Sequence, residues 1–236
     1  MQHPRTSDIP VADREEIIRH SEIGDGLDAA TLALLAVTST TIDFRRRGFI
    51  YRQGDTADAL YVIAAGRVKI CSIDDDTGRE AVIDIVGAGA LFGESSLYSA
   101  GVREKNAVAY ENARLLRIPA GVYREGMAAS RQLYDYTFRM VGQRLSRAEQ
   151  KVADLALDAI PARLDKMLAE LSVRYGRPDP EGVLIDLALP HREIASIVGS
   201  TRESVTVRLN EMRRAGIIDF VDRKILIKTP AASAAA

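Results

Sequence analysis

The chain has 236 residues, 47% of them hydrophobic and 28% charged, which is typical of a globular protein with one large or two small domains. Its net charge of −1 argues against a protein that coats DNA through charge alone, but is compatible with a local basic face. The single cysteine, Cys71, excludes an internal disulfide and an iron–sulfur cluster held by four cysteines. Because the apolar runs are too short for a membrane span and residues 1–26 lack a signal-peptide pattern, we expect a cytoplasmic protein without a membrane partner.

The first half of the chain changes from helical to strand patterns. Residues 1–26 mix Pro, Gly and charges, so we expect a flexible arm there, with at most a short helix near 14–20. Residues 27–37 predict a short helix. From Thr41 to about 119, short alternating strands are separated by Gly and Asp, a pattern that predicts a β-barrel or β-roll within a domain of residues 27–129.

A long helix is predicted over 130–158. After Tyr134, apolar residues recur along it at alternating spacings of three and four, the pattern of a coiled-coil seam. The seam consists of Phe138, Val141, Leu145, Ala148, Val152 and Leu155. The helix then either pairs with a second copy of the chain or packs on its own β-domain; we favour a homodimer.

The C-terminal part, residues 159–229, predicts a winged helix-turn-helix. A helix over 162–175, a loop over 176–182 and a strand over 183–189 lead into two helices separated by Gly199, which permits a sharp turn. Ser200 or Thr201 can cap the second helix, and Gly216 ends it. Two strands joined at Asp222-Arg223 follow, and residues 230–236 are expected to be a disordered tail.

The second helix of this motif is expected to read double-stranded DNA, because such a helix usually enters the major groove. For base contacts we predict Arg202, Glu203, Thr206 and Val207, since Arg suits guanine, Glu suits cytosine and an apolar group suits the thymine methyl. For phosphate contacts we predict His191, Arg192, Thr201, Ser204 and Arg208. Residues 191–228 carry eight Lys and Arg against five acidic residues, a modest local excess of positive charge. The alternative is an ordinary amphipathic helix with a solvated polar face.

The order of β-roll, long helix and winged helix resembles the cyclic AMP receptor protein/FNR family of bacterial transcription regulators. The segments GDTADALYVIAAGRVKI, LFGESSLY and VGSTRESVTVRLNEMRRAGII are most similar to the family, and the resemblance covers about residues 27–229. It implies an α+β fold with a cyclic-nucleotide-binding-type β-roll as effector domain, a dimerisation helix, and RNA polymerase as a partner.

The resemblance also implies an effector pocket formed by Gly93, Glu94 and Arg103. Nucleotide-binding members hold the ribose with the Glu, and the cyclic phosphate with the Arg and a following Ser or Thr; here Glu104 stands at that position. Ala148 and Glu149 likewise stand where cyclic AMP binders place Thr and Ser. Three alternatives are therefore open: a cyclic nucleotide, another small effector, or a structural Glu94–Arg103 ion pair in an altered pocket. No cofactor or metal site is predicted, and the haem and iron–sulfur sensors of the family lack their ligands here.

We therefore predict a dimeric, sequence-specific transcription regulator that binds a palindromic promoter site. The alternative is a ligand-binding module whose helix-turn-helix mediates protein contacts. An enzyme is not expected, because the sequence offers no nucleophile–base pair, metal cluster or phosphate-binding glycine loop. The residues identify neither the effector, nor the target genes, nor the direction of regulation.

Overall fold

The structure is a computed structural model that describes residues 5–7, 9–25, 27–98 and 101–229. The chain divides into two compact units, residues 1–147 and 148–236, and each is described by itself. The long helix α5 (Arg131–Leu157) runs from the first unit into the second, in agreement with the predicted helix over 130–158.

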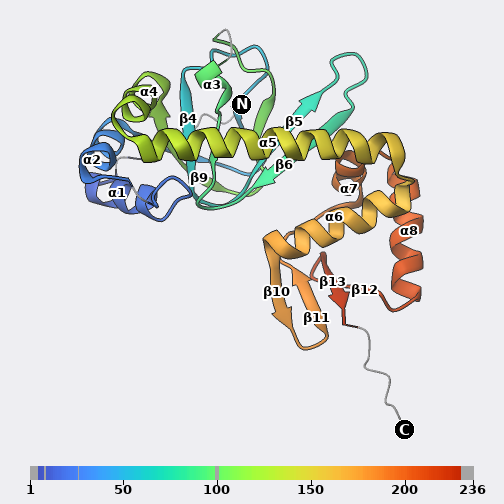
Figure 1. The fold of residues 1–236 in the computed structure, drawn as a ribbon. Helices are drawn as coiled ribbons and strands as arrows, with labels where there is room; N and C mark the ends of the chain where they lie inside the picture. Colours follow the sequence, from blue (N-terminus) through green and yellow to red (C-terminus); the bar gives the residue numbers. More distant parts are fainter. Residues whose placement is uncertain (1–4, 8, 26, 99–100, 230–236) are drawn as a thin grey trace. The chain divides into compact units, whose positions relative to one another are not determined.

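The first unit is a β-roll of two antiparallel sheets with helices beside it (Figure 1). One sheet has the strand order β1-β2-β9-β4-β7, from β1 (Arg5–Ser7), β2 (Thr40–Phe44), β4 (Ala59–Ala65), β7 (Leu91–Phe92) and β9 (Ala113–Pro119). The other has the order β3-β8-β5-β6, from β3 (Phe49–Tyr51), β5 (Val68–Ile73), β6 (Glu80–Val86) and β8 (Asn106–Ala109). The helices are α1 (Val11–Arg19), α2 (Ala29–Thr38), α3 (Ser95–Tyr98) and α4 (Ala120–Ala129). The predicted β-roll over 41–119 is confirmed.

The N-terminal segment differs from the prediction. Helix α1 packs against α2, and Ile18 and Ile23 are buried in the same core as Leu32 and Leu35 of α2. The expected flexible arm is therefore wrong for residues 9–25. Isolated isoleucines among charged residues give only a weak periodic pattern. Burying two such side chains nevertheless contributes about 3–6 kcal/mol to the stability of the fold. The remaining expectations for residues 1–4 and for the tail over 230–236 lie outside the described residues.

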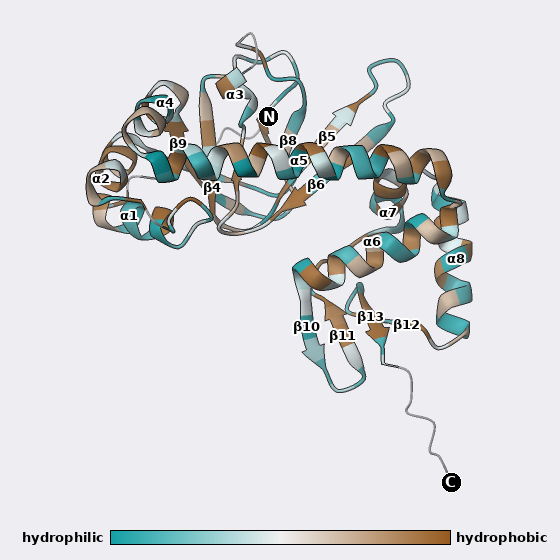
Figure 2. Cartoon of the chain, viewed as in Figure 1, coloured by the Kyte–Doolittle hydropathy of each residue, from teal (hydrophilic) through white to brown (hydrophobic). Residues whose placement is uncertain are grey.

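The second unit contains the C-terminal end of α5 and a winged helix-turn-helix. Its sheet has the order β10-β11-β13-β12, and its elements are α6 (Ile160–Tyr175), β10 (Gly176–Asp179), β11 (Gly182–Ile185), α7 (His191–Val198), α8 (Arg202–Arg214), β12 (Ile218–Val221) and β13 (Lys224–Lys228). Figure 2 shows the apolar character of β11 and β13 in this sheet. The segment 176–182, expected to be a loop, instead begins with strand β10, and its Pro178 is tolerated because β10 is an edge strand.

The two turns of the motif have the backbone geometry that the sequence predicts. Gly199 ends α7 in the left-handed region (φ 64°, ψ 50°), and a Cβ there would lie 2.8 Å from Leu155 Cδ2. Asp222 and Arg223 join β12 to β13 with φ of 47° and 66°, as a two-residue type I′ hairpin requires. The turn at Gly199 thus sets α8 against α7, and the turn at Asp222-Arg223 closes the β12–β13 hairpin.

Candidate DNA-binding surface and effector pocket

The recognition helix α8 presents its N-terminal polar residues to solvent. Thr201 caps the helix by accepting a hydrogen bond from the Ser204 main-chain N–H at 3.2 Å. Arg202, Glu203 and Arg192 are exposed, and neither Arg202 nor Glu203 forms an ion pair with any described residue. Val205, Leu209 and Met212 are buried on the opposite face. Because neither side chain forms an ion pair with a described residue, Arg202 and Glu203 at the start of such a helix are free to hydrogen-bond base edges.

Three predicted contact residues, Arg208, His191 and Thr206, are held by other residues of the second unit. Arg208 forms ion pairs with Asp165 of α6 at 3.7 Å and with Glu211 at 3.5 Å, so its side chain extends along the protein. His191 Nδ1 lies 2.8 Å from Thr206 Oγ1, and that hydroxyl also donates to the Arg202 main-chain oxygen at 2.8 Å. Burial and the positive charge of Arg202 lower the pKa of His191. Val207, between these residues, is 58% exposed.

In the first unit, the Arg103 guanidinium is buried and turned inward. Only 1% of the residue is exposed, Nη1 donates to the Gly93 main-chain oxygen at 3.0 Å, and Nη2 donates to the Ala59 main-chain oxygen at 2.6 Å. Its Cζ lies 4.2 Å from the centre of the Tyr51 ring, a cation–π contact in the interior of the roll. Gly93 adopts φ +87°, and a Cβ there would lie 3.2 Å from Arg103 Nη1. Arg103 therefore supports the backbone around Gly93.

Glu94 pairs with a residue that the sequence analysis did not select. Its carboxylate forms an ion pair with Arg144 of α5, which also donates to the Leu91 main-chain oxygen. Burial alone would lower the pKa of Arg144, but the carboxylates of Glu94, Asp84 and Glu22 together outweigh it and the pKa is raised. The alternative of a Glu94–Arg103 ion pair is thus wrong: each residue has a different partner. No sequence signal pointed to Arg144, because its role depends on tertiary contact between α5 and the roll.

These contacts test whether the pocket fits the cyclic nucleotide that the fold family implies. A cyclic phosphate needs several converging donors. Both terminal nitrogens of Arg103 already donate to main-chain oxygens, which turns the guanidinium toward the backbone, and its buried Nε has no partner among the described residues. The adjacent Glu104 is exposed and would repel a phosphate. The residues in this arrangement do not fit a cyclic phosphate.

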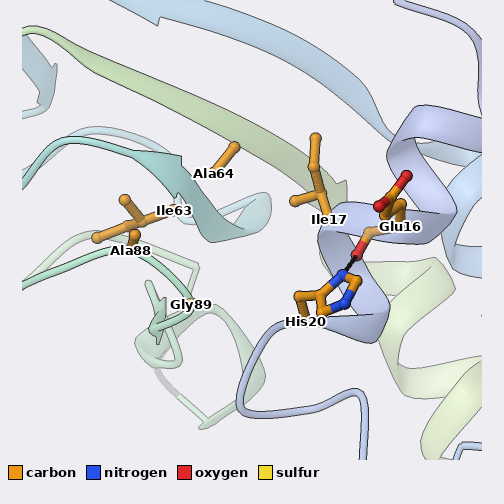
Figure 3. A pocket seen from close by; sticks show the side chains of 7 residues that line it. All are labelled: Glu16, Ile17, His20, Ile63, Ala64, Ala88 and Gly89. Carbon is orange, nitrogen blue, oxygen red and sulfur yellow. Dashed lines mark hydrogen bonds between the residues drawn. The ribbon is translucent and has the colours of Figure 1, made fainter.

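A separate open hollow lies between α1 and the roll (Figure 3). Its lining residues are Glu16, Ile17, His20, Ile63, Ala64, Ala88 and Gly89, and His20 Nδ1 is bonded to the Glu16 main-chain oxygen at 2.9 Å. None of the predicted effector residues lines it. Among the residues that the structure describes, no group of three or more His, Cys, Asp or Glu side chains is placed to hold a metal.

The predicted seam on α5 is mostly uncovered. Phe138, Leu145, Val152 and Leu155 are between 46% and 71% exposed, and Figure 2 shows apolar residues recurring along the helix. Ala148 is exposed as well. Val141 differs, because it is partly buried against the core of the roll. No helix among the described residues is long and apolar enough to cross a membrane.

Comparison with known proteins agrees with this architecture. Residues 41–130 match the cyclic nucleotide-binding domain family, and residues 162–232 match the Crp-like helix-turn-helix domain family. A cyclic AMP receptor protein from Thermus thermophilus is 31% identical over 173 residues, which cover 72% of this chain and 74% of that protein. The chain belongs to the CRP/FNR family of transcription regulators.

Other members of the family are similar over a larger part of the chain. A CRP-like cAMP-activated global transcriptional regulator from Mycobacterium tuberculosis is 29% identical over 90% of this chain and 95% of its own length. Among solved structures, the c-di-GMP responsive global regulator CLP from Xanthomonas campestris superposes with a TM-score of 0.74 at 25% identity, covering 86% of this chain and all of that chain. FixK2 from Bradyrhizobium japonicum has the same fold, with a TM-score of 0.72, 21% identity and coverage of 81% of this chain and 93% of that one.

Proposed function

We propose that this family member is a homodimeric, sequence-specific DNA-binding transcription regulator that works in the cytoplasm and contacts RNA polymerase at a palindromic promoter site. The observation that carries the proposal is the start of α8. Arg202 and Glu203 are exposed there and form no ion pair with any described residue. They follow the left-handed turn at Gly199 and the N-cap Thr201. The uncovered seam on α5 supports the dimer, because two α8 helices then read two half-sites.

The test is selection of bound sequences from random DNA, followed by affinity measurements. A palindrome with guanine and cytosine in each half-site is expected. Arg202→Ala should weaken binding to that site by about 1–3 kcal/mol and leave binding to random DNA nearly unchanged. Arg214→Ala is the matched control, since it removes the same charge from the other end of α8 and should weaken both duplexes alike. Equal losses for Arg202→Ala on both duplexes would contradict the assigned base contact.

An alternative function is a ligand-binding module whose helix-turn-helix mediates protein contacts. It would be favoured if the selection returned no motif at all. The same selection therefore separates the two functions without knowledge of the target genes.

We further propose that DNA binding by this chain does not require cyclic AMP. Two observations support this proposal. The Arg103 guanidinium donates to the main-chain oxygens of Gly93 and Ala59, and the adjacent Glu104 carboxylate would repel a phosphate. Fluorescence anisotropy of the selected duplex at fixed salt, with and without millimolar cyclic AMP, should give dissociation constants within about twofold of each other. A tightening of tenfold or more, about 1.4 kcal/mol of coupling, would overturn this proposal.

A further inference from the structure

His191 and Thr206 join the two helices of the motif through a hydrogen bond of defined direction. His191 is the first residue of α7, and its Nδ1 lies 2.8 Å from Thr206 Oγ1 on α8. The Thr206 hydroxyl has one proton and gives it to the Arg202 main-chain oxygen, which can only accept. The proton between His191 and Thr206 must therefore come from His191 Nδ1. Neutral and protonated imidazole can both supply it, so the bond persists across the titration of His191.

This bonding decides what Thr206 can offer to DNA. Its only proton is used within α8, and its oxygen is held from the α7 side by His191, so no donor remains for a base edge. The oxygen keeps one lone pair, which can accept from adenine or cytosine but not from the O4 acceptor of thymine, so the methyl is the group left to contact a thymine edge. The next residue, Val207, is 58% exposed and also presents only methyl groups. Positions 206 and 207 of α8 thus offer only methyl groups to a thymine edge.

The His191 ring is itself held in place. It lies 6.1 Å from the ring of Phe220 on β12, at an angle of 40°, and the residue is half-buried. His191 therefore links α7, α8 and the wing through a ring with little freedom to turn. A fixed donor of this kind favours one rotamer of Thr206, whose back-bond to the preceding helical turn has the geometry usual for threonine in a helix.

We infer that His191 is a positioning residue for base readout: it holds the Thr206 hydroxyl inward, so that Thr206 and Val207 select thymine through its C5-methyl group. The inference rests on the proposed function, since it needs α8 in the major groove. The chemistry recognised is an apolar methyl on the base edge, which only thymine presents there. Arg202 and Glu203 then read hydrogen-bonding groups, and Thr206 and Val207 read methyl groups.

The experiment replaces single thymidines of the selected half-site by 2′-deoxyuridine, which removes the methyl group alone. Wild-type protein should lose about fourfold in affinity at each of two thymines, the equivalent of about 0.8 kcal/mol for one methyl group. Val207→Ala should abolish the penalty at one of them. Thr206→Ser, which keeps the hydroxyl and removes the methyl, should abolish the penalty at the other.

The role of His191 is tested on the same duplexes. His191→Ala should abolish the deoxyuridine penalty at the thymine assigned to Thr206 and keep the penalty assigned to Val207, which serves as an internal control for folding and docking. His191→Asn should restore the lost penalty, because the Asn amide can donate from nearly the position of Nδ1. The inference is overturned if deoxyuridine has no effect at any thymine, or if His191→Ala retains both penalties.

A second measurement examines the hydrogen bond without DNA. Long-range ¹H–¹⁵N spectra of the three histidines should show His191 as the Nδ1–H tautomer, and Thr206→Val should remove this preference. An Nε2–H tautomer would overturn the inference even if the protein bound DNA as proposed. Failure of the wild-type protein to select any DNA sequence would instead refute the proposed function on which the inference rests.

Discussion

Phe138→Ala should greatly weaken the homodimer. Phe138 is 71% exposed on α5 and stacks on Tyr134 with ring centres 6.5 Å apart, so a large apolar surface has no cover within the described residues of one chain. Burying a Phe side chain contributes about 1.5–3 kcal/mol, and a two-fold dimer contains the residue twice. The loss should therefore be about 3–6 kcal/mol, which raises the dissociation constant of the dimer by about 10²- to 10⁴-fold.

Sedimentation equilibrium over a dilution series measures this constant directly. The matched control is Leu157→Ala, because Leu157 lies on the same helix and is 84% exposed, but is not in the seam series. The control should dissociate like the wild-type protein. If both variants keep the wild-type dissociation constant, or if wild-type protein is a monomer at all concentrations, the seam does not hold two copies together.

Two other predictions concern buried or partly buried groups. Arg103→Ala removes two hydrogen bonds from a charged donor, one to the Ala59 oxygen and one to the Gly93 oxygen, which keeps the Ser96 main-chain N–H as a donor; it should lower the free energy of unfolding by about 3–6 kcal/mol. Arg131→Ala removes only an exposed ion pair with Asp135 and should lower it by less than about 0.5 kcal/mol. Chemical denaturation measures both. A loss for Arg103→Ala as small as that of Arg131→Ala would contradict the structural role of Arg103. DNA affinity should also rise as pH falls from 8 to 6. The pKa of His191 is lowered in the free protein by burial and by Arg202, whereas a phosphate at the predicted His191 contact would raise this pKa in the complex. Protonation therefore favours the complex: the gain is complete below the free-protein pKa and is lost as pH rises through that of the complex. The slope should flatten in His191→Asn, and an unchanged slope in that variant would contradict this explanation.

The parts of the fold that the sequence predicts well are those set by local rules. Gly199 needs positive φ, Thr201 has the side chain of an N-cap, and Asp222-Arg223 lies between two alternating segments, so each feature follows from a few neighbouring residues. The sequence pattern did not predict the packing of α1. Ile18 and Ile23 are buried by contacts with α2 and the roll, and a local pattern does not show such contacts. Local sequence signals therefore predict the helix-turn-helix motif, whereas the order of the N-terminal segment depends on tertiary packing.

The functional side chains divide in the same way. Exposure of Arg202 and Glu203 follows from their place at the start of an amphipathic helix and was predicted. The partners of Glu94, Arg103 and His191 were not, because each partner lies at least ten residues away in the chain. A sequence pattern states that an Arg or His is present, but whether its donors face a ligand or a main-chain oxygen depends on the packing around it.

Helix α5 shows that its two expected roles, packing on its own roll and pairing with a second chain, do not exclude each other. Its inward face repeats at spacings of four, three, four and three through Leu133, Thr137, Met140, Arg144 and Arg147. The first three are buried, Arg144 pairs with Glu94, and Arg147 lies 3.9 Å from Asp84. This face is apolar only in its first half, so a search for apolar residues finds the outward seam alone. The helix thus packs on its own roll through one face while another remains available to a second chain, and Arg144 connects the inward face to the loop that carries Glu94.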